Sequence, residues 1–370
     1  MRYLNKEDVK NIATGASLFG AGGGGDPYVG MMMAISAIEK NGPVKLLSLD
    51  EIDNDDIYMP AASMGAPLVM TEKFPKGDEF TRAFNRLGKY LGKPITGTFP
   101  MEAGGVNSMI PIVVAAQAGI PLVDCDGMGR AFPELQMTTF HLGGVSATPM
   151  VVTDEKGNLS ILETVTDKWS ELLARDQVVE MGASASVSLY PSTGQQMKKN
   201  GIRGIISRCE KVGEIVKNHT KGKDWQLNQL LDLTKGFHLF DGKIVDISRE
   251  TRDGFNYGEM TIQGLNDYKD QQMVIEFQNE NLIAKRNDEI VTSVPDLICL
   301  ADMDNLLPST TESIKYGKRI TVLGLPADKK NGGHQRELRQ SDQDTSAMIL
   351  TIKQLNQLMR RLKYEISFRN

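Results

Sequence analysis

The densest group of reactive side chains lies where the sequence reads DCDGMGRAFPEL. Asp124, Cys125 and Asp126 follow a short apolar run, and the nearest imidazole belongs to His141. Carboxylate, thiolate and imidazole groups are zinc ligands in proteins. We therefore expect Asp124, Asp126 and His141 to bind zinc, with Cys125 as a fourth ligand, although their spacing matches no zinc motif.

Two more charged side chains follow in the same segment. Glu134 is a candidate general base, and Arg130 joins it among the catalytic candidates. An alternative is purely structural: Arg130 pairs with Asp124 or Asp126, and Cys125 is a small buried apolar residue.

A run of four glycines in GAGGGGDP is the second candidate. Glycine backbone ahead of a helix N-terminus can approach and bind an anionic or polar group. The run is neither a dinucleotide fingerprint nor a P-loop, because a helical pattern precedes it and no Gly-Lys-Ser/Thr follows. A tight turn between two helices is the alternative. The candidate ligand-binding residues are Gly22, Gly23, Gly24, Gly25 and Asp26.

Acids and amides also stand together in MEAGGVN and in EFQNEN. In the first motif, Glu102 is a second candidate general base and Asn107 a candidate substrate-binding amide. In the second, Asn279 and Glu280 could bind the polar edge of a heterocycle. A helix N-cap and a solvated turn, respectively, are the alternatives.

Periodicity predicts the elements that position these motifs. Helices are predicted over residues 5–19, 27–40, 81–91, 106–119, 166–181, 193–200 and 204–217. Strands are predicted over 45–49, 57–63, 121–125 and 185–189, with a hairpin over 148–162 and strand-rich sequence from 238 to 294. Asp241-Gly242 is a typical hairpin turn.

Helices alternating with short strands indicate an α/β fold for the N-terminal half. A length of 370 residues favours two domains, which we place at 1–165 (α/β) and 166–370 (a β-richer α+β domain). A terminal helix from about Thr345 carries an apolar stripe from Met348 to Ile366. This stripe packs either on its own domain or against a second copy, and we expect a homo-oligomer.

Composition excludes several protein classes. The formal charge of -5, without a basic block, argues against nucleic acid as a partner. The longest apolar stretch, 110–123, is too short to span a membrane, and no signal peptide is evident. Three cysteines without a CxxC pair favour a reducing compartment. We expect a soluble, cytoplasmic protein that acts on a small molecule.

Several motifs occur in a fixed order: GAGGGGDPYVG, MGAP, EAGGVN, DCDGMGRAFPELQM, FQNEN and VPDLI. Together they resemble the S-methyl thiohydantoin desulfurase-like family over about residues 7 to 325. The resemblance implies an N-terminal α/β domain and a β-richer C-terminal domain. It also implies zinc-dependent hydrolysis of S-methyl thiohydantoin to hydantoin, with release of methanethiol.

The leading hypothesis is therefore a metal-dependent hydrolase acting on a small hydantoin-like ring. A zinc-bound water would attack the ring carbon that bears the leaving group. Glu102 or Glu134 would be the general base, and the glycine run would hold the polar edge of the ring. The alternative is a non-catalytic or nucleotide-binding accessory protein of a hydantoinase/oxoprolinase-type system, in which the glycines cradle phosphate.

Overall fold

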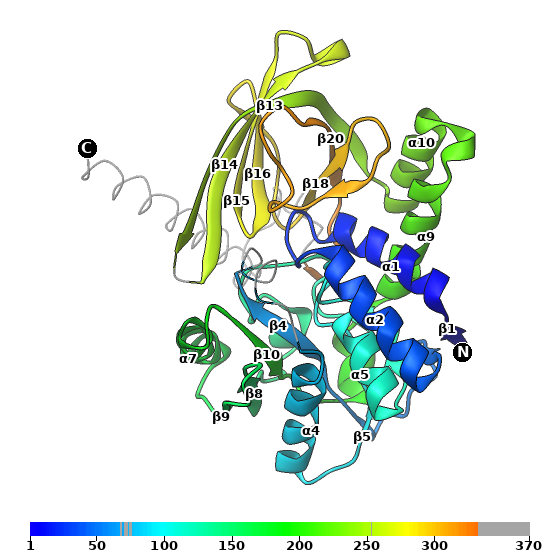
Figure 1. Ribbon diagram of the computed structural model, residues 1–370, viewed down its shortest axis with the longest axis vertical. Helices are drawn as coiled ribbons and strands as arrows, with labels where there is room; N and C mark the ends of the chain where they lie inside the picture. The colour runs from blue at the N-terminus through cyan, green and yellow to red at the C-terminus, as the bar shows by residue number, and fades with distance from the viewer. Residues whose placement is uncertain (67–68, 70–72, 74–75, 253, 332–370) are drawn as a thin grey trace, which may run out of the picture.

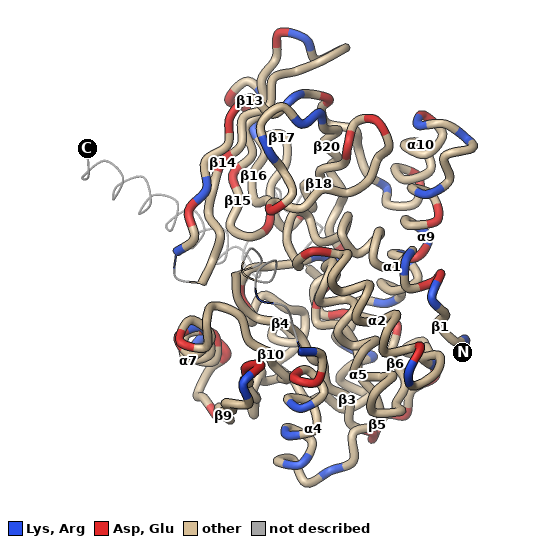
Figure 2. The backbone as a smooth tube through the Cα atoms, viewed as in Figure 1, with Lys and Arg blue, Asp and Glu red and all other residues tan. Residues whose placement is uncertain are grey.

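Figure 1 shows the computed structural model of the chain, which describes residues 1–66, 69, 73, 76–252 and 254–331. A large antiparallel sheet occupies one end of the molecule, and helices with several small sheets occupy the other. Lys and Arg are interspersed with Asp and Glu in both regions (Figure 2). The N-terminal region is α/β and the C-terminal region is sheet-rich, as the sequence predicts.

Local capping signals in the sequence begin the first two helices. The Asn5 side chain accepts hydrogen bonds from the backbone N–H groups of Glu7 and Asp8, and the Asp8 side chain accepts one from the Asn5 N–H, which completes a capping box. Asp26 caps the second helix, with Pro27 at its first position. Among the described residues, the helices with at least one full turn are α1 (Lys6–Phe19), α2 (Pro27–Asn41), α4 (Glu79–Leu91), α5 (Ile110–Ala118), α6 (Thr139–Leu142), α7 (Asp167–Glu180), α8 (Gly194–Asn200), α9 (Ile205–Lys217) and α10 (Lys223–Thr234). Short 3₁₀ turns are η1 (His219–Lys221), η2 (Asn266–Tyr268) and η3 (Lys329–Asn331).

The N-terminal region contains small sheets rather than one continuous sheet. Their strand orders are β1-β2-β6, β4-β10-β8-β9, β11-β3-β5 and β12-β7. The strands are β1 (Arg2–Leu4), β2 (Val44–Leu47), β3 (Ile57–Tyr58), β4 (Ala61–Gly65), β5 (Ile95–Gly97), β6 (Leu122–Val123), β7 (Cys125–Asp126), β8 (Met150–Thr153), β9 (Leu159–Leu162), β10 (Ser184–Ser188), β11 (Ser192–Thr193) and β12 (Ile202–Arg203). β10 lies after the predicted boundary at residue 165 but pairs with β4 and β8, which precede it. The boundary itself stays a prediction.

Within the described residues, the C-terminal region forms an eight-stranded sheet in the order β17-β16-β15-β14-β13-β20-β18-β19. The strands are β13 (Phe237–Arg252), β14 (Phe255–Gly264), β15 (Gln272–Gln278), β16 (Glu280–Arg286), β17 (Glu289–Ser293), β18 (Leu297–Asp302), β19 (Pro308–Ser309) and β20 (Arg319–Leu325). One apolar core joins the two regions, because α1, α2, α5 and α9 share buried contacts with residues of β18 and β20.

Four sequence predictions differ from the structure. Asp241-Gly242 is not a hairpin turn but lies inside β13, where the Asp241 side chain accepts a hydrogen bond from the Thr321 hydroxyl and pairs with His238. The predicted strand 57–63 is split into β3 and β4, which pair in different sheets on either side of Pro60. The helix predicted from Val106 begins at Ile110, because the Val106 N–H binds the carbonyl of Gly24. The strand predicted over 121–125 is divided at Asp124 into β6 and β7.

The terminal helix predicted from Thr345, with its apolar stripe, lies outside the described residues, so its role in self-association stays a prediction. Within the part of the chain that the structure describes, no helix combines the length and the apolar character needed to cross a bilayer.

Candidate functional site

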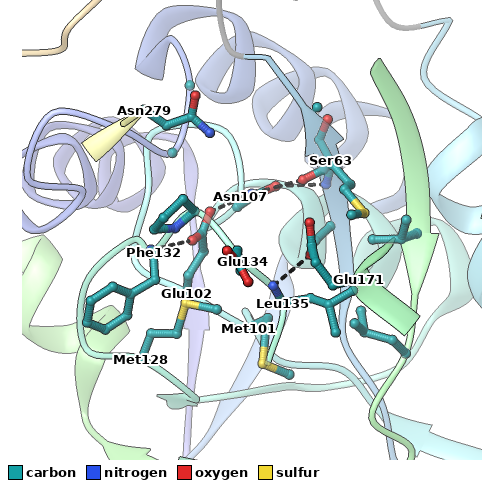
Figure 3. Close-up of a pocket in the computed structure, with 18 of the residues that line it drawn as sticks. Ser63, Met101, Glu102, Asn107, Met128, Phe132, Glu134, Leu135, Glu171 and Asn279 are labelled. Atoms are coloured by element: carbon teal, nitrogen blue, oxygen red, sulfur yellow. Dashed lines mark hydrogen bonds between the residues drawn. The ribbon is translucent and has the colours of Figure 1, made fainter. Parts of the chain in front are cut away.

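The motifs found separately in the sequence meet around one pocket of about 760 Å³, part of which is open to solvent. Its walls come from the glycine run, β4, the 101–107 turn, the 128–135 segment, α7 and the turn between β15 and β16. Figure 3 shows Glu102, Asn107, Glu134, Glu171 and Asn279 among the side chains that line this pocket. The pocket thus lies where the two regions of the chain contact each other.

Glu102 is the best-oriented acid in the pocket. Its side chain is 7% exposed. One carboxylate oxygen accepts a hydrogen bond of 2.6 Å from the Asn107 amide, and the other accepts one of 3.3 Å from the Phe132 N–H. Burial raises the pKa of Glu102 to about 7, although these hydrogen bonds and the charge of Arg130 act in the opposite direction. A carboxyl group with this pKa can exchange a proton at neutral pH.

Asn107 links Glu102 to Ser63 of β4. Its side-chain oxygen accepts a hydrogen bond of 2.8 Å from the Ser63 N–H, and its amide nitrogen donates to the Ser63 carbonyl at 3.2 Å as well as to Glu102. The amide of Asn107 is therefore fixed by the strand edge (Figure 3). It lines the pocket and orients the acid rather than capping a helix.

Asn279 and Glu280 enter the pocket from the turn between β15 and β16. Asn279 has a φ of 57°, a left-handed conformation that asparagine tolerates. Its side-chain oxygen accepts a hydrogen bond of 2.8 Å from the Asn256 N–H. Glu280 is 3% exposed. The turn is therefore buried against the N-terminal region and is not a solvated turn.

Arg130 does not line the pocket but ties its parts together. The guanidinium is fully buried and donates to the backbone carbonyls of Ala131, Asn281, Pro295 and Asp296. It also stacks on Phe132, with 4.5 Å between the guanidinium carbon and the ring centroid. Burial lowers the pKa of Arg130 to about 10, and the carboxylates nearby act against this. The predicted catalytic role gives way to a positioning one, since its N–H groups are engaged by carbonyls.

The glycine run is required mainly by contacts within the protein. A Cβ on Gly24 would lie 2.3 Å from the Gly104 Cα, and one on Gly23 would lie 2.0 Å from the Glu280 Oε1. The Gly22 carbonyl accepts hydrogen bonds from the N–H and the hydroxyl of Thr311. Of the predicted ligand-binding glycines, Gly24 and Gly25 line the pocket, whereas Gly22 and Gly23 contact the C-terminal region. Asp26 caps α2 through a bond of 2.8 Å from the Tyr28 N–H.

Glu134 lines the pocket but is already paired, since it accepts hydrogen bonds from Gln136 and Lys168. Sequence analysis missed two other lining residues, Glu171 and Arg175, which form an ion pair of 2.8 Å on α7. Their i,i+4 spacing on a predicted helix was the available signal, but it does not show that the helix faces a pocket.

The predicted zinc ligands do not converge. Asp124 accepts hydrogen bonds from Ile206 and Ser207 at the start of α9, and Asp126 accepts one of 2.8 Å from the Gly129 N–H. Cys125 is fully buried, and burial with the neighbouring aspartates raises the pKa of its thiol well above the ordinary value.

The fourth predicted ligand points elsewhere. His141 bonds Asp167 through Nδ1 at 2.7 Å and has an exposed side chain. Asp167 also accepts hydrogen bonds from the Ala147 N–H and from Tyr190. Burial alone would raise the pKa of Asp167, but the bond with His141, followed by those from Ala147 and Tyr190, holds it below the ordinary value. Among the described residues, no three His, Cys, Asp or Glu side chains are grouped to bind a metal ion. The residues predicted to bind zinc therefore do not fit it as one set.

The fold and the sequence of this chain both resemble those of known proteins. A crystal structure of a protein from Chromobacterium violaceum superposes with a TM-score of 0.75 at 22% identity, covering 92% of this chain and 97% of that one, which shows a shared fold. No curated protein sequence matches this chain. The model of the S-Me-THD-like N-terminal domain matches residues 7–164, and that of the S-Me-THD-like C-terminal domain matches residues 165–337. Since the two matches together span most of the 370 residues, this chain belongs to the S-Me-THD-like family.

Proposed function

We propose that this chain is a hydrolase of a small hydantoin-like ring, acting on S-methyl thiohydantoin or a close relative, with Glu102 as the general base. The observation that carries the proposal is the Glu102 carboxyl group, buried in the pocket, fixed by Asn107 and given a pKa of about 7. A general base works best when its pKa lies near the working pH.

The pocket lining supports a neutral ring rather than a phosphate. The apolar side chains of Met101, Met128 and Phe132 line the pocket together with the amides of Asn107 and Asn279. The acids that line the pocket are Glu102, Glu134, Glu171 and Glu280, whereas Arg175 is an arginine already paired with Glu171. Among the described residues that line the pocket, no unpaired cation is available to bind phosphate, so the nucleotide-binding alternative has less support.

The proposed reaction consumes one water molecule. Glu102 takes a proton from water as the water oxygen bonds to the ring carbon that carries the methylthio group. The carbon–sulfur bond then breaks, methanethiol leaves, and a ring carbonyl remains. No proposed step uses zinc, because the residues predicted to bind it do not converge.

The test is to incubate the purified protein with S-methyl thiohydantoin and measure thiol release and hydantoin formation. We expect turnover whose kcat/KM rises with pH through about 7, because the base must be ionised. Glu102→Gln keeps the side-chain shape and is expected to lower kcat/KM by roughly 10²–10⁴-fold.

Glu259→Gln is the matched control, because Glu259 is exposed on β14 and does not line the pocket. Its activity should equal that of the unmodified protein. An E102Q protein that is folded and fully active would contradict the role of Glu102. The proposed reaction would be contradicted if none of the S-methylated or unmodified hydantoin analogues gave product.

A further inference from the structure

A second carboxyl group faces the same pocket from the opposite region of the chain. Glu280 is the first residue of β16, and the left-handed conformation of Asn279 turns it inward. Its side chain is 3% exposed and lines the pocket together with Glu102. The two acids come from segments far apart in the sequence, so only the folded chain brings them together.

The hydrogen bonding of Glu280 is incomplete. Its Oε2 atom is buried and has no hydrogen-bond partner among the described residues. Its Oε1 atom lies against Gly23, where even a Cβ would overlap it. Arg130, the nearby cation, donates its hydrogen bonds to backbone carbonyls instead. A buried carboxylate without a partner is costly, so this group is suited to carry a proton or to meet a ligand.

The two acids differ in what surrounds them. Both oxygens of Glu102 accept hydrogen bonds, which favour its ionised form. Burial, followed by the charge of Glu102, raises the pKa of Glu280 well above its ordinary value, and Arg130 only partly opposes this. Environments that separate two carboxyl groups in this way are typical of an acid and base pair.

We propose that Glu280 is the acid of this site: its protonated carboxyl donates to the ring nitrogen or oxygen of a neutral heterocycle while Glu102 activates water. This inference rests on the proposed hydrolase function and assigns the general acid that acts together with the general base Glu102. It also defines the ligand class as an uncharged ring with a hydrogen-bond acceptor beside the reacting carbon.

The proton transfers balance over two steps. In the first, the water oxygen bonds to the ring carbon, Glu102 takes a water proton, the C=N π electrons move to the ring nitrogen, and that nitrogen takes the proton of Glu280. In the second, the carbon–sulfur bond breaks, the methanethiolate takes the proton from Glu102, and the new hydroxyl group returns its proton to Glu280 as the carbonyl forms. Both carboxyl groups regain their starting states, and the products are hydantoin and methanethiol.

The kinetic test compares the unmodified protein with Glu280→Gln and Glu280→Asp on S-methyl thiohydantoin. The unmodified protein should lose activity as the pH rises through the raised pKa of Glu280, and this loss is the alkaline fall. The E280Q protein should lose roughly 10²–10⁴-fold in kcat and should no longer show the alkaline fall. The E280D protein keeps a carboxyl group and should recover part of the rate together with the alkaline fall. E280Q activity within about threefold of the unmodified protein, well short of the usual loss of a general acid, with the alkaline fall intact, would overturn the proposal.

A second measurement does not depend on turnover. Hydantoin itself serves as the probe, with its affinity measured by calorimetry from pH 6 to pH 10. Affinity for the unmodified protein should fall as Glu280 loses its proton, whereas E280Q, whose amide always donates, should bind hydantoin without this dependence. The same melting temperature for both proteins at neutral pH excludes misfolding as the cause.

The two measurements separate the possible failures. If thiol is released but E280Q behaves as the unmodified protein in both assays, the Glu280 assignment fails and the hydrolase function stands. If no substrate is turned over but hydantoin affinity shows the Glu280-dependent pH effect, the proposed reaction is overturned. Glu280 then remains the protonated group that donates a hydrogen bond to the ligand. If neither turnover nor this pH effect is observed, both the hydrolase function and the Glu280 assignment are overturned.

Discussion

Two pairs of acids lie in motifs that suggest chemistry: Asp124 with Asp126, and Glu102 with Glu280. The two pairs have different surroundings in the structure. Asp124 directs its oxygens to the start of α9, and Asp126 accepts from its own turn at Gly129. Glu102 and Glu280 instead face a shared pocket from two distant segments.

The difference shows what sequence proximity can and cannot indicate. Asp124 and Asp126 are neighbours because one strand ends there, and strand ends need polar side chains to satisfy turns and helix starts. Tertiary packing brings Glu102 and Glu280 together, with Gly23 against Glu280 and Gly24 against Gly104. Substitutions near the pocket acids, compared with substitutions of Asp124 and Asp126, test whether only the first set affects activity.

Replacement of Gly24 is expected to have the largest effect on stability. Gly24 has a φ of 77°, and a Cβ there would lie 2.3 Å from the backbone of Gly104. Gly24→Ala should therefore lower the free energy of unfolding by about 2–5 kcal/mol, combining left-handed strain with overpacking. Chemical denaturation of the purified protein measures the change.

Gly23→Ala is the matched comparison. Its new Cβ would meet the side chain of Glu280 rather than backbone. It should lose less stability than Gly24→Ala but should lose activity, because the Glu280 carboxyl group must move. Equal losses of stability for both variants would show that the run is needed only for folding.

Asp124→Ala tests the other side of the comparison. Loss of the bonds to the Ile206 and Ser207 N–H groups at the start of α9 should cost about 0.5–2 kcal/mol, as for a lost helix cap. Hydrolase activity and metal content should stay unchanged if the group is structural. Elemental analysis of protein purified without chelators checks this, and loss of a bound zinc in the variant would restore the metal-ligand assignment.

Asp126→Asn should have the smallest effect, and its sign depends on pH. Burial raises the pKa of Asp126 well above its ordinary value. The folded state therefore favours the protonated acid, and its stabilisation is complete below the unfolded pKa and is lost as pH rises through the folded pKa. The amide does not ionise, so the variant should gain stability relative to the unmodified protein as pH increases. Melting temperatures at pH 5 and pH 8 measure this, and parallel pH dependences would contradict a buried acid.

Much of the N-terminal fold could be predicted because its signals are local. Asn5 with Asp8, and Asp26 with Pro27, mark helix starts within a few residues. The hairpin at 148–162 is likewise confirmed by β8 and β9. The hairpin turn predicted at Asp241-Gly242 was wrong because a contact distant in sequence requires this glycine. A Cβ on Gly242 would lie 2.6 Å from the Gln263 carbonyl oxygen of the neighbouring strand.

The site could be predicted only in pieces. Glu102, Asn107 and Glu280 were singled out by residue type and do line one pocket, and the family is confirmed. Their relation to one another was not visible, because no spacing in the sequence places residue 102 beside residue 280. The zinc set was drawn from neighbours in sequence, which explains why its members face different elements.

The bond between Thr311 and the carbonyl of Gly22 spans 289 residues. During synthesis, which adds about 5–20 residues per second, the glycine run therefore waits roughly 15–60 s for the segment that covers it. The contacts that Gly22 and Gly23 make with Thr311 and Glu280 are absent until these later residues have been made. The pocket between the two regions therefore cannot be completed until residues 279–311 have been made.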